Sequence, residues 1–151
     1  MKLTEHFSTE EFEHSEVAAR FGLINAIPPE LIGEAKETAE MMEGIRAALG
    51  GNPIQVTSAW RSPDVNRRVG SRPTSDHLKM KAVDFVCPGF GSPLEVAQAL
   101  GTLEKMDALG IGQLIYEYTW IHVSRALPAN PINRILSIQG RGSSVSVGIQ
   151  E

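Results

Sequence analysis

Apolar residues in the first third of the chain recur at spacings of three and four, which is typical of helices with one buried face. Ser8 followed by Glu11 indicates a capping box, so a first helix is predicted to begin here and to end near Gly22. A second helix is predicted to begin near Pro29 and to stop at the glycine pair 50–51. Its apolar positions are Leu31, Ala35, Ala39, Met42, Ile45 and Leu49.

After Pro53 the pattern changes to the short apolar or alternating runs that are typical of β-strands. Residues 54–60 are predicted to form one strand. Residues 81–87 are predicted to form another, which is apolar on both faces as in the centre of a sheet. The remaining predicted elements are a short helix through Val69, a third helix capped by Ser92, a hairpin of residues 114–116 with 120–124, and a last strand at residues 135–138.

The order of these elements, helices first and strands later, predicts the α+β fold class, with N-terminal helices packed on a small antiparallel sheet. A chain of 151 residues is long enough to form a core of its own, so residues 1–151 are expected to be a single domain. The run GRGSSVS has little to bury, and residues 140–151 are therefore predicted to be a flexible tail.

Composition excludes several kinds of partner. The formal net charge is -4 and no basic run is present, so we expect no nucleic acid. No apolar stretch reaches the roughly 18 residues of a spanning helix, which predicts no membrane insertion. The N-terminus lacks the apolar core of a signal peptide, so synthesis in the cytoplasm is expected. The protein is expected to be a monomer.

Two of the four histidines lie among residues that could form a metal site. His77 stands seven residues before Asp84, a spacing that suits a histidine on a loop and a carboxylate on the strand that follows. His122 lies in the alternating run WIHVS, which places it on the face opposite Ile121 and Val123. Two imidazoles and one carboxylate leave a tetrahedral zinc ion with an open fourth position, as in hydrolytic sites.

Spacing alone leaves other interpretations open. A half-buried histidine on a strand is often a hydrogen-bonded core residue, and Asp84 could cap a turn. His6 and His14 lie in a polar region beside glutamates and are interpreted as solvated.

Four segments resemble, in the same order, segments of the D-Ala-D-Ala carboxypeptidase (M15-type) family of zinc peptidases. Residues 75–84, SDHLKMKAVD, look like the family signature S-x-H-x-x-G-x-A-x-D. Residues 120–124, WIHVS, look like its W-x-H segment, and residues 58–66, SAWRSPDVN, are similar to its S-G-Y-R-S-x-x-x-N segment. Residues 7–32 resemble the helical N-terminus of a subgroup that includes phage lysins.

The resemblance implies a Hedgehog/DD-peptidase-like fold that binds one zinc ion per chain through His77, Asp84 and His122. It also implies an acid/base residue near the second histidine, and Glu117 is the best candidate in the sequence. Arg61 matches the arginine upstream of the first ligand. Its guanidinium is expected to hold the carbonyl oxygen as charge develops there, or a substrate carboxylate.

Ser75 and Trp120 are expected near the substrate. Ser75 is predicted to hydrogen-bond beside the ligand loop. Trp120 is predicted to orient the second histidine or to form a pocket wall, with plain core packing as the alternative. The glycine of the signature is Met80 here. Because glycine at such a position usually serves a positive φ or a close approach, the loop must change conformation or give the Met80 side chain room.

The expected function is that of a zinc metallopeptidase that hydrolyses peptide bonds of bacterial peptidoglycan, as a carboxypeptidase or an endopeptidase acting on the stem peptide. The subgroup resemblance and the missing signal peptide favour a phage endolysin, released by a holin or carried in the virion. Two alternatives stay open, namely a cytoplasmic D-Ala-D-Ala dipeptidase and a non-catalytic zinc-fold domain that binds peptidoglycan.

Overall fold

The computed structural model describes residues 1–140 and 144–151, where helices pack against a six-stranded sheet. The α-helices are α1 (Thr9–Glu13), α2 (Glu16–Phe21), α3 (Ile32–Ala48), α4 (Pro63–Val69), α5 (Pro93–Leu100) and α6 (Leu103–Leu109). Three short 3-10 turns are η1 (Pro29–Leu31), η2 (Asp76–Lys79) and η3 (Pro131–Arg134). The strands are β1 (Gln55–Ser58), β2 (Ala82–Val86), β3 (Gln113–Tyr116), β4 (Ile121–Ser124), β5 (Ile135–Gln139) and β6 (Ser144–Val147).

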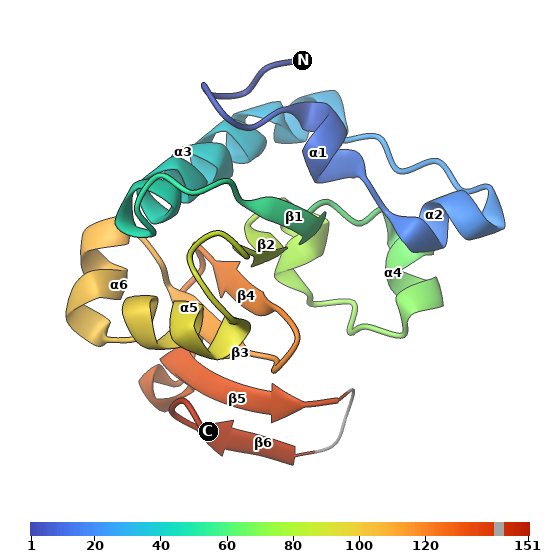
Figure 1. Ribbon diagram of the computed structural model, residues 1–151. Helices are drawn as coiled ribbons and strands as arrows, with labels where there is room; N and C mark the ends of the chain where they lie inside the picture. Colours follow the sequence, from blue (N-terminus) through green and yellow to red (C-terminus); the bar gives the residue numbers. More distant parts are fainter. Residues whose placement is uncertain (141–143) are drawn as a thin grey trace.

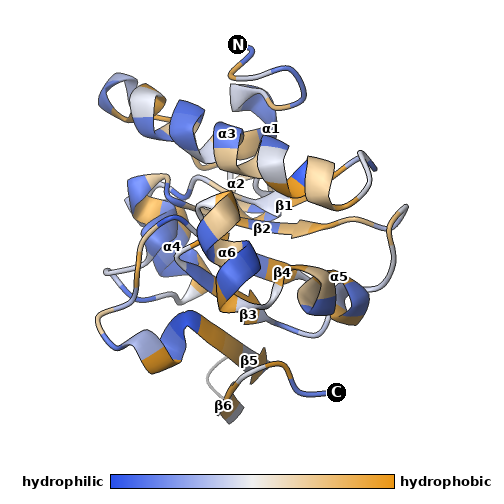
Figure 2. Ribbon diagram, turned by 90° about the vertical axis from the view of Figure 1, so that its left-hand side faces the viewer, coloured by the Kyte–Doolittle hydropathy of each residue, from blue (hydrophilic) through white to orange (hydrophobic). Residues whose placement is uncertain are grey.

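The strands follow the order β1-β2-β4-β3-β5-β6 across the sheet. Helices α1, α2 and α3 lie beside the β1 end of the sheet, and β5 and β6 lie at the opposite end (Figure 1). Helix α5 packs on β3 and β4, and α6 contacts α3. Strands β2 and β5 are mostly hydrophobic, whereas α4 is mostly hydrophilic (Figure 2). The α+β class predicted from the sequence is confirmed.

The prediction of an antiparallel sheet was wrong at one pairing, because β5 runs parallel to β3. The connection from β4 to β5 stays at one end of the sheet and passes the start of β3, so β5 pairs with β3 on its outer side. Arg134 fixes this passage by donating to the carbonyls of Ile111 and Gly112 at 2.9 Å. Gly112 is required there, since a Cβ atom would lie 2.4 Å from the carbonyl oxygen of Ala126. The sheet is therefore mixed.

The C-terminal segment contains a strand that the sequence did not predict. Residues 144–147 form β6, which pairs antiparallel with β5. Ser137 of β5 supports this edge, because its hydroxyl donates to the carbonyl of Gly148 at 2.8 Å. Backbone pairing orders these residues although Val145 and Val147 stay exposed. The predicted tail also covers residues 141–143, which lie outside the described residues.

The first predicted helix is two helices. Ser15 accepts a hydrogen bond from the Ala18 amide at 3.1 Å and so caps a new helix, α2, where α1 was expected to continue. The last carbonyls of α1 accept hydrogen bonds from other segments. The carbonyl of Phe12 accepts from the Trp60 amide, and the carbonyl of Glu13 accepts from the side chain of Asn25. Within the described ranges, no helix is long and apolar enough to cross a membrane.

Candidate metal centre

Strand pairing brings Asp84 and His122 together at the centre of the sheet. The two residues are direct partners in the antiparallel pairing of β2 with β4. The Nδ1 atom of His122 lies 2.8 Å from Oδ1 of Asp84. Their neighbours Ile121 and Val123 are fully buried in the hydrophobic core, which confirms the alternation predicted for β4. The sheet thus presents a carboxylate and an imidazole on the same face.

His77 reaches the same place from the turn η2, just before β2. Its ring is 1% exposed, and its Nε2 atom lies 3.4 Å from Oδ1 of Asp84. The rings of His77 and His122 have centroids 5.2 Å apart. One donor atom from each of His77, Asp84 and His122 lies within 4.8 Å of the others. The structure therefore gathers the three residues that the sequence proposed as metal ligands.

Hydrogen bonding fixes which nitrogen of His77 is available to a metal ion. Its Nδ1 atom lies 2.6 Å from the carbonyl oxygen of Ala59, which can only accept a hydrogen bond, so Nδ1 carries the proton. The Nε2 atom then has a lone pair directed toward the Asp84 carboxylate. It is buried and has no hydrogen-bond partner in the part of the chain that the structure describes. An unprotonated nitrogen and a carboxylate oxygen that face each other with no proton between them provide two ligand atoms for a cation.

Charge reinforces this arrangement. Burial alone would raise the pKa of the Asp84 carboxyl, but the nearby imidazoles of His77 and His122 outweigh it and hold that pKa far below its usual range. Burial lowers the pKa of His77, so its ring is held neutral as a ligand must be. Burial also disfavours charged His122, but the hydrogen bond that His122 donates to the Asp84 carboxylate, together with the negative charge of Asp84, outweighs burial and raises the pKa of this imidazole. The centre thus keeps an anionic carboxylate beside two imidazoles.

Glu117 lies in the tight connection between β3 and β4 and is half-buried. Burial raises the pKa of its carboxyl, and the negative charge of Asp84 adds to the effect. Trp120 donates a hydrogen bond from its indole nitrogen to Oε2 of Glu117 at 2.9 Å. A carboxylate with a raised pKa beside a candidate metal centre has the properties of a general base.

Arg61 is buried behind the centre, with 9% of its surface exposed. Its Nη1 atom donates to Oδ1 of Asn66 on α4 at 3.3 Å. Its charge works against protonation of His77 and His122, which places the guanidinium within electrostatic range of both rings. Asn66 is itself fixed, because its amide donates to the carbonyl of Arg72 at 3.0 Å. The arginine is therefore buried within electrostatic range of the candidate metal centre.

The remaining predicted site residues have clear positions. Ser75 caps η2, and its hydroxyl accepts a hydrogen bond from the amide of His77 at 3.3 Å. Trp120 donates its indole hydrogen bond to Glu117, so among the described residues it orients the glutamate and not His122. Met80 has φ 57° and ψ 29°, the left-handed conformation that a glycine would favour. The turn therefore keeps the backbone shape expected of glycine, and the Met80 side chain is buried in the core.

Sequence reasoning missed the residues that hold the ligands in place. The carbonyl of Ala59 binds His77, and Asn66 holds Arg61. Asp76 accepts a hydrogen bond from the Ser124 hydroxyl at 2.8 Å, which holds the turn before His77. A signal existed for Asn66, which is the last residue of the S-x-x-R-S-x-x-x-N segment. A backbone carbonyl such as that of Ala59 leaves no trace in a sequence.

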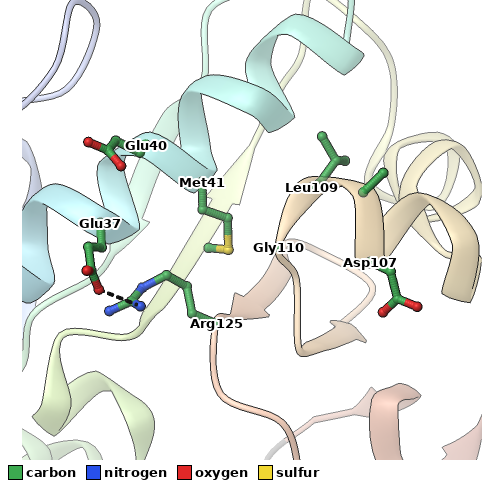
Figure 3. Close-up of a pocket in the computed structure, with 8 residues that line it drawn as sticks. Glu37, Glu40, Met41, Asp107, Leu109, Gly110 and Arg125 are labelled. Carbon is green, nitrogen blue, oxygen red and sulfur yellow. Dashed lines mark hydrogen bonds and ion pairs between the residues drawn. The ribbon is translucent and has the colours of Figure 1, made fainter.

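Two surface hollows lie away from this centre. One is lined by Leu23, Asp64, Arg67 and Arg68. The other lies between α3 and α6, where Glu37 and Arg125 face Asp107 across the opening (Figure 3). Neither hollow includes a residue of the triad.

Comparison with known proteins gives one family. The family described as Peptidase M15 matches residues 5–124. This span begins before α1 and ends with β4, so it contains all three triad residues together with Arg61 and Glu117. No curated protein matches the sequence.

Proposed function

Since the chain belongs to the peptidase M15 family, whose members are zinc-dependent peptidases, we propose that it is a zinc metallopeptidase of bacterial peptidoglycan. The observation that carries the proposal is the buried lone pair of His77 Nε2, directed at Asp84 and beside His122. These residues fit zinc by type and by number, with two imidazole nitrogens and one carboxylate. One zinc ion per chain is proposed.

Three protein ligands would leave the fourth position of a tetrahedral zinc ion open to water or substrate. When bound, zinc supplies a Lewis acid that favours ionisation of water and polarises the scissile carbonyl. Glu117 is proposed to take the proton of the attacking water and to deliver it to the leaving amine nitrogen. Its raised pKa supports this role, because a base that must later donate the proton works best with a pKa near the working pH.

Arg61 is proposed to stabilise negative charge on the substrate. Its guanidinium is fixed by Asn66 and lies in range of the His77 ring, so its charge is in place before substrate binds. Either a carbonyl oxygen that gains charge or the C-terminal carboxylate of a stem peptide suits this group. Trp120 is proposed to set the direction of the Glu117 carboxylate, and Ser75 to hold the His77 turn at the edge of the substrate site.

The proposed substrate is the stem peptide or cross-bridge of peptidoglycan, cleaved beside a D-amino acid by a monomeric enzyme. The resemblance of residues 7–32 to phage lysins favours a role as an endolysin that reaches the wall during phage release. Met80, the departure from the family signature, is the feature of the sequence that favours the alternative of a non-catalytic peptidoglycan-binding domain. That support is weakened, because Met80 adopts the backbone conformation that the family glycine would favour. A dipeptidase stays as the second alternative from the sequence.

Digestion of purified peptidoglycan tests the proposal. The zinc-loaded protein is expected to create new peptide termini, which mass spectrometry identifies as loss of a terminal D-Ala or as an opened cross-bridge. The Glu117→Ala variant serves as the matched control, since it should keep zinc. Activity on free D-Ala-D-Ala without activity on the wall would support the dipeptidase. The absence of new termini in both assays, with zinc bound, would contradict the peptidase function.

A further inference from the structure

The turn that carries His77 is held on both sides by buried side chains from other elements. Before His77, the carboxylate of Asp76 accepts a hydrogen bond from Ser124 of β4 at 2.8 Å. After it, the carbonyl oxygen of Met80 accepts a hydrogen bond from the Thr38 hydroxyl of α3 at 2.7 Å. The ligand is therefore clamped between a strand of the metal centre and a helix that contributes no ligand.

Thr38 is an unusual residue for its position. It lies on the buried face of α3 beside Ala39 and Met42, and its own exposure is 0%. A hydroxyl there must find partners, and Thr38 has two. It donates to the Met80 carbonyl and accepts from Nε of Arg125 at 2.9 Å. The result is a chain of hydrogen bonds in one direction, from Arg125 to Thr38 to Met80, in which each bond strengthens the next.

Arg125 joins this chain to the metal centre from the other side. It follows Ser124 directly, and its amide donates to the carbonyl of Lys81 at 3.0 Å. Its guanidinium forms ion pairs with Glu34 and Glu37 of α3, the second of which is drawn in Figure 3. Arg125 therefore connects the end of β4 and the start of β2 to α3, the helix whose Thr38 binds Met80.

The hydrogen bond from Thr38 matters because Met80 has an unfavourable backbone conformation. A residue with a side chain seldom adopts φ 57°, so the backbone would relax if nothing held it. The amide of Met80 faces the carbonyl of His77 at 3.4 Å, and its carbonyl is the group that Thr38 binds. If the Met80 carbonyl shifts, the Met80 amide shifts with it, and so does the His77 backbone to which that amide is hydrogen-bonded.

We propose that Thr38 is a positioning residue for the metal ligand His77, acting through the Met80 carbonyl and supported by Arg125. It touches neither metal nor substrate. It fixes the left-handed turn, and the turn fixes the direction of Nε2 toward Asp84. This inference rests on the proposed function in one respect, namely that the triad binds zinc.

A purely structural role for Thr38 makes a different prediction, and a matched control separates the two. Ser137 of β5 is also a buried hydroxyl that donates to a backbone carbonyl, that of Gly148, and accepts from the amide of Gln150. It lies two strands away from β4 in the sheet. Ser137→Ala removes the same type of bond as Thr38→Val, so both variants should lose stability. Only Thr38→Val should also lose metal affinity.

The test measures the zinc Kd of the full chain by competition with a chromophoric chelator, together with the Tm of the metal-free protein. Thr38→Val is expected to weaken zinc binding by about 10- to 100-fold, the usual effect of losing an outer-shell partner. Thr38→Ser restores the hydroxyl and should restore affinity, and Ser137→Ala should keep the wild-type Kd. The visible spectrum of the cobalt-substituted Thr38→Val protein should also differ from wild type, because the ligand geometry changes.

The outcomes distinguish this proposal from the function itself. A wild-type chain that binds no zinc would overturn the proposed function. A wild-type chain that binds zinc while Thr38→Val shows only a lower Tm, with unchanged Kd and cobalt spectrum, would overturn the positioning role alone. If Thr38→Val does not fold, Arg125→Gln takes its place, because Arg125 is partly exposed. That variant should show a smaller loss of zinc affinity, and no loss would also overturn the proposal.

Discussion

Two turns carry residues of the proposed site, one with His77 and one with Glu117, and each turn contains a residue in the left-handed conformation. Met80, with φ 57°, ends the turn η2 that carries His77, and Tyr118, with φ 66°, directly follows Glu117. Apart from glycines, these are the residues with positive φ among those that the structure describes. Such backbone costs about 1–2 kcal/mol in a residue with a side chain. Its occurrence beside a proposed ligand and a proposed base links both turns to function.

The two turns are supported in different ways. Met80 is fully buried, and Thr38 binds its carbonyl. Tyr118 is half-buried, and its ring packs against that of Tyr116 with centroids 4.5 Å apart. The ligand turn is thus fixed inside the core, whereas the turn with Glu117 lies at the surface, where substrate can reach it. This difference agrees with the proposed roles, in which a buried turn holds a metal ligand and a surface turn carries the general base.

Removal of a ligand should have the largest effect. His122→Ala deletes one of the three proposed metal donors and leaves Asp84 without its 2.8 Å partner, so stable zinc binding should be lost. Elemental analysis after zinc loading and dialysis measures the zinc per chain. His14→Ala is the control, since His14 is exposed, and it should keep one equivalent. A full equivalent of zinc on His122→Ala would exclude this residue as a ligand.

A substitution of Glu117, in the turn between β3 and β4, should lower the rate of hydrolysis without affecting zinc binding. Glu117→Ala is expected to keep zinc and fold but to digest peptidoglycan about 10²–10⁴-fold more slowly, the size of a general acid–base contribution. Release of soluble muropeptides under conditions of excess wall gives the rate. Near wild-type digestion would place the base elsewhere. Asp76 is then the next carboxylate to test, although its bond from Ser124 makes it less available.

Glycine substitutions test whether the two left-handed residues are supported differently. Met80→Gly relieves the backbone but removes a buried side chain, and losing such a side chain costs about 2–5 kcal/mol. The net effect should be a loss of about 1–3 kcal/mol in the free energy of unfolding. Tyr118→Gly removes a half-buried ring and should change that free energy by about 1 kcal/mol or less.

Chemical denaturation of the two metal-free variants beside wild type gives both values. Zinc affinity of Met80→Gly should be unchanged or slightly lower, because the glycine adopts the same turn and still offers its carbonyl to Thr38. Equal losses of stability at the two positions would contradict the distinction between a buried turn and a surface turn.

The smallest expected effect concerns the pH dependence of activity. Burial raises the pKa of Glu117, while the Trp120 hydrogen bond favours the carboxylate and lowers that pKa. Trp120→Phe removes this bond, so the pKa should rise further. Because a general base acts as the carboxylate, the acidic limb of the kcat/KM profile should move to higher pH. An unchanged limb, or one moved to lower pH, would show that Trp120 does not tune the glutamate.

The sequence allowed the triad to be predicted because its residues lie in local patterns, and because residues 75–84 and 120–124 resemble the family signature. Spacing alone had left other interpretations open. His122 is in an alternating strand, and Asp84 is in a strand that is apolar on both faces. Pairing of those strands was enough to bring the two together. The class of the fold was predictable for the same reason, since spacing of apolar residues reports helices and strands directly.

What could not be predicted depends on contacts between distant segments. The parallel pairing of β5 with β3 follows from the path of residues 125–134, which no local pattern reveals. The role of Thr38 depends on a carbonyl 42 residues away in the sequence. A threonine among the apolar residues of a helix was a signal, but its partner could be identified only in three dimensions. Met80 shows the converse, since a departure from the family pattern left the backbone conformation intact.

The central claim is that one zinc ion lies between His77, Asp84 and His122. Diffraction from crystals of the zinc-loaded protein, with data collected above and below the zinc absorption edge, tests it most directly. The account predicts a single strong anomalous peak within bonding distance of one donor atom from each of the three residues. A peak elsewhere, for example beside His6 and Glu43, which form an ion pair at 2.7 Å, would contradict it. So would the absence of any peak at the triad in fully loaded crystals.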